Sequence, residues 1–289
     1  MSDVNDKLAG LRNRYLERDD EFDPEGRVYR DKATGEIFHS VTRILSATMA
    51  DENKKALEKW LERPNSAQSR DAAAARGTSA HDHMEYLTKT ASRLVRSTAN
   101  KRGVWKSGFD GLYRAPEGIT SWALSKALQG APRPRLHSEG WALCLRGYLL
   151  DRITAIHSTE FSIHHAEGFA GTCDLLADVK HPESNKSKLA LLDWKTTGRA
   201  IHRSDPSHYE NYRDQLGAYS LGLKACASIT AEAGVLVIGR QSGEPQEIWL
   251  NREELDQAEA NFLERCTRYF DALHERLQAQ KKEAEASPN

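Results

Sequence analysis

The spacing of apolar residues divides the chain into helical and extended stretches. Apolar positions recur at helical intervals in six stretches, namely 52–64, 71–88, 121–129, 138–153, 207–224 and 252–276. Short apolar runs bounded by Gly, Pro, Ser or Asn predict strands at 158–165, 171–179, 189–195, 233–240 and 245–250. This order of elements predicts an α/β protein in which helices flank one central sheet.

The N-terminal part is expected to be more polar and partly helical. Residues 1–25 form a polar segment in which a short helix over 4–18 is expected. A hairpin is predicted over 27–38, with its turn at 32–35, because that turn separates two short extended runs. Ser40 is placed to cap a short helix that follows the hairpin.

Length and composition are those of an ordinary globular protein. The 289 residues are 39% hydrophobic and 29% charged. We expect a single domain over 26–276, with an insertion near 90–137 and a solvated tail at 277–289. No apolar run approaches the roughly 18 residues that span a bilayer. The first thirty residues mix acids and bases, unlike a signal or transit peptide, so the expected location is the cytoplasm of a bacterial cell or phage-infected host.

The net charge of −1 does not by itself indicate nucleic-acid binding. For such binding, a local basic strip matters more than the net charge of the chain. One strip within the insertion provides candidate DNA-binding residues: Arg93, Arg96, Lys101, Arg102 and Lys106. The insertion also contains four aromatic residues: Trp105, Phe109, Tyr113 and Trp122. The insertion therefore has two interpretations. Its aromatic and basic side chains could bind a single strand by stacking and by charge, or it could be a surface subdomain with its own small core.

The candidate chemistry lies on two of the predicted strands. Alternation along 189–195 places Asp193 and Lys195 on one face, with Trp194 directed into the packing. If 171–179 pairs with this strand, Asp174 can lie beside Asp193. Two close carboxylates repel each other, and a hard divalent cation relieves that repulsion. The Asp-x-Lys triplet alone is weak, since an exposed ion pair on a strand would also explain it.

Two predicted helices carry further candidates. Gly77 and His81 lie one turn apart, and the glycine indicates close packing against another backbone, with His81 facing the site. His81 taken alone is also typical of a structural histidine. On the helix over 207–224, Gln215 and Tyr219 share one face with Tyr212. An aromatic core stripe would explain Tyr219, whereas Gln215 inside an apolar stripe favours a role in the site.

Together these motifs resemble RecB-like nucleases of the PD-(D/E)XK superfamily. The ordered matches are Gly77-x-x-x-His81, Gly171-Thr172-x-Asp174, Asp193-Trp194-Lys195-Thr196 and Gln215-x-x-x-Tyr219. The segment 40–46 and the helix around Trp60 look closest to the mitochondrial genome maintenance exonuclease and its phage and bacterial relatives. The resemblance covers roughly 27–275, apart from the insertion.

The resemblance implies a restriction-endonuclease-like core and a role for each matched residue. Asp174, Asp193 and the main-chain carbonyl of Trp194 would bind Mg²⁺ or Mn²⁺, with His81 as a further ligand and Glu160 at an acidic position of some relatives. Lys195 would be the catalytic lysine, and the residues that assist it would be Gln215 and Tyr219. The implied activity is a metal-dependent DNA exonuclease that acts on single strands or free ends.

The sequence departs from some relatives, and other functions stay open. Cys144, Cys173, Cys226 and Cys266 do not stand where cluster-binding members place their cysteines, so no iron–sulfur cluster is expected. The helicase phosphate-binding loop is absent, which predicts a stand-alone nuclease. The alternatives are a DNA-binding or assembly factor that does not cut, and a site-specific endonuclease.

Overall fold

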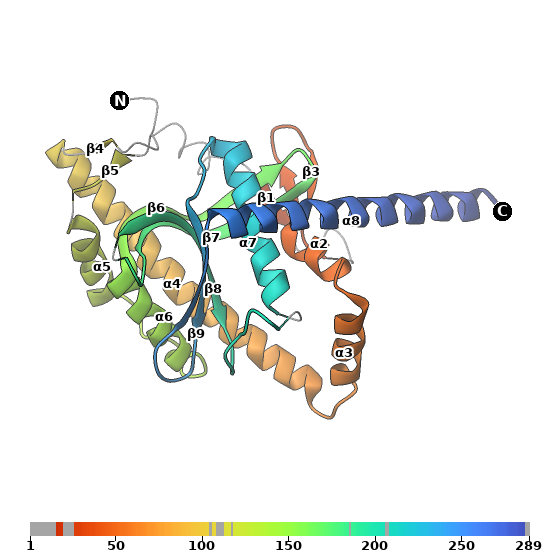
Figure 1. Ribbon diagram of the computed structural model, residues 1–289, viewed down its shortest axis with the longest axis horizontal. Helices are drawn as coiled ribbons and strands as arrows, with labels where there is room; N and C mark the ends of the chain where they lie inside the picture. Colours follow the sequence, from red (N-terminus) through yellow and green to blue (C-terminus); the bar gives the residue numbers. More distant parts are fainter. Residues whose placement is uncertain are drawn as a thin grey trace.

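An eight-stranded mixed sheet lies at the centre of the computed structural model (Figure 1). The structure describes residues 16–19, 26–103, 106–107, 113–116, 118–184, 186–205 and 208–286. The strands of this sheet are β1 (Leu16–Asp19), β2 (Val28–Asp31), β3 (Ile37–Ser40), β6 (Ile153–His165), β7 (Phe169–Lys180), β8 (Ser187–Thr196), β9 (Ala233–Gly239) and β10 (Gln246–Leu250). The short strands β4 (Lys106–Ser107) and β5 (Tyr113–Arg114) form a separate pair.

The sheet contains both strand directions. Its order is β1-β2-β3-β7-β8-β9-β10, and β6 also pairs with β7. Strands β6, β7 and β8 form an antiparallel meander, whereas β3 with β7 and β8 with β9 are parallel pairs. The predicted central mixed sheet is therefore confirmed.

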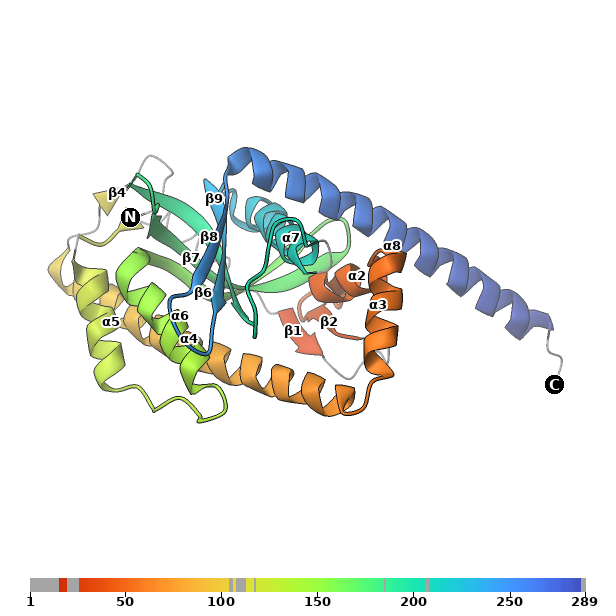
Figure 2. The same ribbon diagram turned by 60° about the horizontal axis from the view of Figure 1, so that its bottom comes forward.

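Helices cover both faces of the sheet (Figure 2). They are α2 (Val41–Ala47), α3 (Asp51–Leu61), α4 (Ser66–Arg102), α5 (Ile119–Gln129), α6 (Glu139–Arg152), α7 (Tyr209–Ala227) and α8 (Arg252–Ala286). In β8, Leu189 and Leu191 pack in one core with α2, α7 and α8. Their neighbours Leu192 and Trp194 pack in a second core with α4, α5 and α6. Both faces of this strand are buried, as its continuous apolar run predicts.

The N-terminal elements differ in part from the prediction. The hairpin and the Ser40 cap are confirmed, since the backbone N–H of Arg43 donates to Ser40 Oγ at 3.1 Å. The expected helix over 4–18 is wrong at its end, because Leu16–Asp19 is strand β1. Leu16 packs beside Tyr29, Phe38 and Ala170, and this contact with the sheet outweighs local helical propensity. The rest of that predicted helix lies outside the described residues.

The insertion near 90–137 contributes to the main core. Helix α4 continues to Arg102, well beyond its predicted end at 88, and ends at Gly103 in the left-handed conformation (φ 62°). Helix α5 packs on α4 and buries Ala123, Leu124 and Ala127 in the core that contains Trp194. The interpretation of this stretch as a subdomain with its own core is therefore wrong for α5. Trp105 and Phe109 lie outside the described residues.

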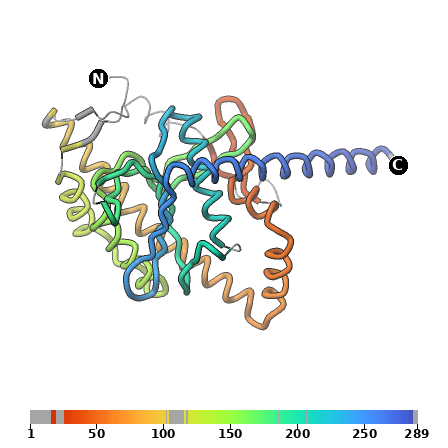
Figure 3. Tube along the Cα trace, in the orientation of Figure 1, coloured from red at the N-terminus to blue at the C-terminus, as the bar shows by residue number. Residues whose placement is uncertain are grey.

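Helix α8 extends past the sheet. Its first half packs on α7 and buries Phe262 and Cys266, whereas 274–285 are exposed and continue the helix away from the other elements (Figure 3). The predicted end of this helix at 276 is too early by ten residues, since it runs to Ala286. Within the part of the chain that the structure describes, no helix is both long and apolar enough to cross a membrane.

The most important feature for the site is a change of partner along one edge of β7. Its first residues, Phe169 and Ala170, pair with β3, and its second half, from Leu175 onward, pairs with β8. On its other edge, β7 pairs with β6 along almost its whole length. Among the described residues, none pairs with the backbone of 171–174 on the first edge. This gap between β3 and β8 gives side chains access to the middle of the sheet.

Candidate active site

A cavity of about 460 Å³ opens at the gap in the sheet. All of the residues for which the sequence predicts a metal-binding or catalytic role line it: His81, Glu160, Asp174, Asp193, Trp194, Lys195, Gln215 and Tyr219. They come from α4, β6, β7, β8 and α7. Three consecutive strands and two helices, one before and one after them in the sequence, thus bring these residues together.

The Asp174 side chain takes the place of a backbone hydrogen-bond acceptor where β7 and β8 separate. The ladder between the two strands ends at the pair Leu175 and Leu192. One residue further, Asp174 Oδ2 accepts a hydrogen bond of 2.7 Å from the backbone N–H of Trp194. This bond fixes the Asp174 carboxylate at the edge of the gap, with its side chain only 10% exposed.

Asp193 and Lys195 begin a chain of polar contacts that reaches α7. Lys195 Nζ lies 2.5 Å from Asp193 Oδ2 and donates a hydrogen bond of 3.0 Å to Gln215 Oε1. Gln215 Nε2 in turn donates to Tyr219 Oη at 2.7 Å. The ammonium group also lies 4.9 Å from the centre of the Tyr212 ring, a favourable cation–π arrangement. Because its donors and its stem are held on several sides, Lys195 is fixed in one position.

Burial and close charges shift the pKa values of these groups. Burial raises the pKa of Asp174 to about 6; His81 works against this shift and Asp193 adds to it. For Lys195, burial alone would lower the pKa, but the carboxylates of Asp193 and Asp174 outweigh it and raise the pKa above its ordinary value. Lys195 is therefore cationic at neutral pH beside two carboxyl groups, an arrangement typical of functional sites.

His81 lies over the same point from α4. Its Nε2 is 2.7 Å from the carbonyl oxygen of Trp194, and its Nδ1 is 3.7 Å from Asp174 Oδ1. The ring thus bridges the two strands at the gap. Gly77, one turn earlier, also lines the cavity.

The two glycines of the predicted motifs have different roles. A Cβ atom at Gly77 would meet only Thr196 Oγ1, at an ordinary 3.6 Å, so the expected close approach to another backbone is wrong. A Cβ atom at Gly171 would lie 2.8 Å from Tyr219 Cε1. Gly171 is therefore the glycine that the packing of the site requires, because it leaves room for the Tyr219 ring.

Glu160 adds a third carboxyl group in an unusual conformation. Its φ of 44° is in the left-handed region, which is rare for a non-glycine residue in a strand and is concentrated at functional sites. Burial, followed by the charges of Asp174 and Glu85, raises its pKa to about 8. Glu85 lines the same cavity one turn after His81 and forms an ion pair with Lys89.

The donor atoms at the cavity fit a hard divalent cation. Asp193 Oδ2 is buried and accepts no hydrogen bond of acceptable geometry, although Lys195 is close. Carboxylate and backbone carbonyl oxygens are donors that suit Mg²⁺ or Mn²⁺. In the described part of the chain, no three His, Cys, Asp or Glu side chains stand at metal-binding spacing. The fit therefore rests on the two aspartates, with Trp194 O and His81 beside them.

Sequence reasoning missed several residues of this cavity. Arg18 and Arg27 contribute cationic groups, and Tyr29 Oη lies 3.2 Å from Thr172 Oγ1 in the gap. Arg18 lies on β1, Tyr29 on β2 and Arg27 just before β2, in a part of the chain where only a short helix and a hairpin were predicted. Thr172, by contrast, stands inside the Gly171-Thr172-x-Asp174 motif and on the predicted face of Asp174.

Arg93, Arg96 and Lys101, the members of the predicted basic strip whose side chains the structure describes, do not line this cavity. Arg93 is twelve residues after His81 on α4, which corresponds to about 18 Å along the helix axis. Arg93 is exposed, whereas Arg96 is half-buried and donates a hydrogen bond of 2.8 Å to Ser92 Oγ. Burial, followed by the charge of Arg93, lowers the pKa of Arg96. A DNA-binding role for this strip stays a prediction.

A central mixed sheet flanked by helices, with two aspartates and a lysine at a gap in it, agrees with the expected restriction-endonuclease-like core. The model of the PD-(D/E)XK nuclease superfamily matches residues 10–289, and the chain belongs to this superfamily. Nucleases of this superfamily typically use divalent metal ions such as Mg²⁺. No curated protein matches the chain.

Solved structures show low similarity. The protein SSO0001 is 17% identical, with 62% of this chain and 73% of that chain covered and a TM-score of 0.24. Rai1 of Scheffersomyces stipitis, in complex with (3′-NADP)⁺ and calcium ion, is 13% identical, with 69% and 59% covered and a TM-score of 0.27. This chain thus spans less than two thirds of that Rai1 chain.

Proposed function

We propose that this protein is a RecB-like, Mg²⁺- or Mn²⁺-dependent exonuclease that hydrolyses DNA from single-stranded or free ends. The observation that carries this proposal is the convergence of Asp174, Asp193 and Lys195 at the gap in the sheet. A structural ion pair would not require a second buried carboxylate, a lysine held by Gln215, and a cavity in front of them.

Each residue has a proposed role that follows from its contacts. Asp174, Asp193 and the carbonyl of Trp194 would hold the cation, with His81 on the α4 side and Glu160 on the β6 side. A cation bound there supplies Lewis-acid activation of water and neutralises charge on the phosphate.

Lys195 is the proposed catalytic lysine. Its ammonium group stabilises the negative charge that develops on the phosphate oxygens, and its fixed position avoids reorganisation during the reaction. Gln215 and Tyr219 keep it in place through their hydrogen bonds. In the overall reaction, water adds to phosphorus, the bond from phosphorus to the 3′-oxygen breaks, and the products are a 5′-phosphate and a 3′-hydroxyl.

The test is digestion of end-labelled single-stranded DNA, linear duplex DNA and closed circular DNA with Mg²⁺, with and without EDTA. We expect the linear substrates to be degraded from their ends, the circle to stay intact, and EDTA to abolish cleavage. Discrete fragments from the circle would identify a site-specific endonuclease instead. Binding without cleavage under both metals would identify a DNA-binding or assembly factor.

Variants test whether the activity depends on the site residues. Asp193→Ala and Lys195→Ala should each abolish digestion, whereas Lys188→Ala should retain it. Lys188 is a matched control because it lies on the same strand, opposite Val179 at the far end of the β7–β8 ladder. Full activity of either site variant would contradict the assignment.

A further inference from the structure

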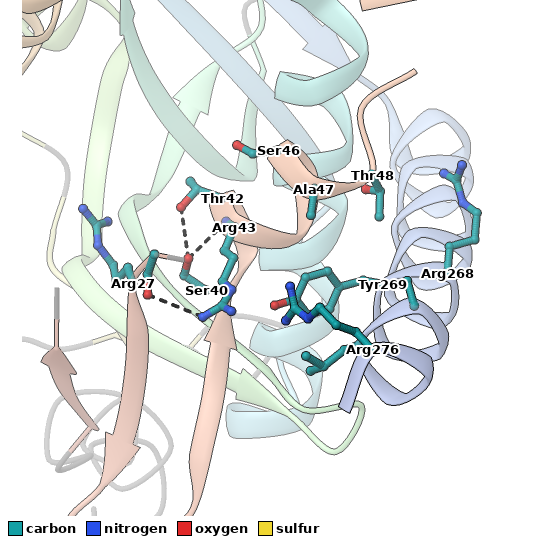
Figure 4. Close-up of a pocket in the computed structure, with 13 residues that line it drawn as sticks. Arg27, Ser40, Thr42, Arg43, Ser46, Ala47, Thr48, Arg268, Tyr269 and Arg276 are labelled. Atoms are coloured by element: carbon teal, nitrogen blue, oxygen red, sulfur yellow. Dashed lines mark hydrogen bonds between the residues drawn. The ribbon is translucent and has the colours of Figure 1, made fainter. Parts of the chain in front are cut away.

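A second cavity, of about 820 Å³, lies beside the active-site cavity and has a different chemistry (Figure 4). It is formed by the two residues before β2, the end of β3, α2 and the middle of α8. Arg27, Ser40 and Thr42 line both cavities. The two spaces are therefore neighbours with a common wall.

Cationic groups dominate this second cavity. Four arginines line it, Arg27, Arg43, Arg268 and Arg276, and no acidic residue is found among its described lining residues. In a chain whose net charge is −1, four guanidinium groups around one hollow are a marked local concentration of positive charge. Several cations at one low-dielectric surface focus the electrostatic field and attract anions.

The arginines are placed by the packing of α2 against α8. Figure 4 shows Arg43 and Arg276 reaching toward Tyr269 from these two helices. The guanidinium carbon of Arg43 lies 5.9 Å from the centre of the Tyr269 ring, and its Nη1 donates to the carbonyl of Gly26 at 3.5 Å. Tyr269 Oη is held by His39 Nδ1 at 2.8 Å. The positions of these groups are thus built into the fold.

The hydroxyl groups of the common wall continue this polar surface. Ser40 Oγ and Thr42 Oγ1 lie 3.2 Å apart, between the arginine-lined cavity and the active site. Guanidinium and hydroxyl groups are the side chains that most often contact phosphate oxygens. The volume lies within the range of about 300–1,000 Å³ that holds whole ligands, so it exceeds what one phosphate needs.

We propose that the arginine-lined cavity binds the phosphodiester backbone of the DNA strand whose scissile phosphate occupies the active site. This inference rests on the proposed function. It follows from the shared wall, since a strand bound in one cavity can continue along that wall into the other. The cavity would bind phosphates next to the cleaved bond and hold the strand in register. It would contribute affinity for DNA without contacting the reacting atoms.

The test uses Arg268→Gln/Arg276→Gln in the full-length chain. Both arginines are exposed on α8, so the fold should be retained. The matched control is Lys281→Gln/Lys282→Gln, which removes the same charge from the same helix beyond the cavity. The readout is the dissociation constant of a fluorescent single-stranded oligonucleotide in EDTA, measured by anisotropy over a range of salt concentrations.

We expect the arginine variant to bind the oligonucleotide more weakly, with a smaller salt dependence. Each lost phosphate contact lowers the slope of log K against log salt by about 0.7 for a single strand, so two contacts give about 1.4. The lysine control should keep the slope of the wild type. A dinucleotide has a single phosphodiester, so with that group in the active site no phosphate remains for the arginine-lined cavity, and its affinity should be the same in both variants.

Two results would overturn the proposal. One is an equal slope in the arginine variant and the lysine control. The other is a loss of affinity for inorganic phosphate with unchanged affinity for the oligonucleotide, which would identify an anion site unrelated to DNA. Because binding is measured without metal, absence of cleavage by the wild type would contradict the proposed function and leave this test intact.

Discussion

The two neighbouring cavities differ in their balance of acidic and basic side chains. The active-site cavity contains the carboxyl groups of Asp82, Glu85, Glu160, Asp174 and Asp193, whereas the arginine-lined cavity contains none in the described chain. A metal-dependent nuclease requires both environments, since carboxylates bind the cation and cationic groups bind the polyanionic substrate. A short wall at Ser40 and Thr42 separates them.

The difference also concerns how each cavity is assembled. The carboxylates lie on three strands of the central sheet and on helix α4, close to short recognisable motifs. The arginines come from both ends of the described chain, with Arg27 and Arg43 before residue 50 and Arg268 and Arg276 after residue 265. An active centre is thus easier to recognise in a sequence than a binding surface, because the residues of such a surface have no fixed spacing along the chain.

The largest expected effect is on catalysis, from Asp174→Asn. This change keeps the size of the side chain but removes a charge from the cation site, and we expect kcat to fall by about 10³-fold. The loss should be equal on long DNA and on a small phosphodiester such as bis(p-nitrophenyl) phosphate. A loss confined to long DNA would place Asp174 in DNA binding, and would remove the distinction between the two cavities.

A large effect on stability is expected from Arg265→Met. Arg265 is buried and bonds Asp214 at 2.8 Å, and it also donates to the carbonyl of Leu45 and to Thr48 Oγ1. These bonds join α7 to α2 and α8, and the last two helices line the arginine-lined cavity. Removing the cation leaves a buried carboxylate with fewer partners, which should lower the free energy of unfolding by about 3 kcal/mol.

The measurement is urea-induced unfolding, with Arg133→Met as the control. Arg133 forms an exposed ion pair with Glu139, 82% exposed on the arginine side, and such pairs contribute less than about 1 kcal/mol. Equal losses in the two variants would show that the Arg265 contacts do not hold the cavity together.

A smaller effect on catalysis is expected from Gln215→Ala. The variant removes the acceptor that holds Lys195 but leaves its ion pair with Asp193. We expect kcat to fall by about tenfold with little change in KM, because the lost contact positions a catalytic group. Gln257→Ala, at an exposed position on α8, is the control. An unchanged kcat in Gln215→Ala would exclude a positioning role.

The smallest effect concerns the turn that leads into β7, the strand that contains Asp174. Burial lowers the pKa of His165, whose Nδ1 accepts a hydrogen bond of 3.2 Å from the backbone N–H of Glu167. Because the unfolded chain binds this proton more readily, stability should decrease as the pH falls below about 6.5. His165→Gln should reduce this decrease slightly, and exposed His202→Gln should not. Thermal unfolding at several pH values measures it; identical pH profiles for wild type and His165→Gln would contradict the interpretation.

The sequence allowed most of the central sheet to be predicted, because apolar runs and turn residues mark β6 to β10 clearly. Its failures have physical causes. Leu16 joins a strand through contacts with residues far along the chain, and α4 extends beyond 88 because α5 packs on it. Local patterns do not contain such tertiary contacts.

The candidate site was predictable to a similar extent. Asp174, Asp193 and Lys195 stand in recognisable motifs, and Gln215 was marked by its place in an apolar stripe. Two features were not visible: the gap caused by the change of partner along β7, and the positive φ of Glu160. Both depend on how the strands are arranged in space.

The central claim is that Asp174 and Asp193 form a divalent-cation site at the gap in the sheet. Electron paramagnetic resonance of Mn²⁺ titrated into the protein tests it directly, since bound Mn²⁺ loses the sharp signal of the free ion. We expect the wild type to deplete this signal, and the variant Asp174→Asn/Asp193→Asn, folded as judged by circular dichroism, not to do so. Equal Mn²⁺ binding by the wild type and this double variant would contradict it.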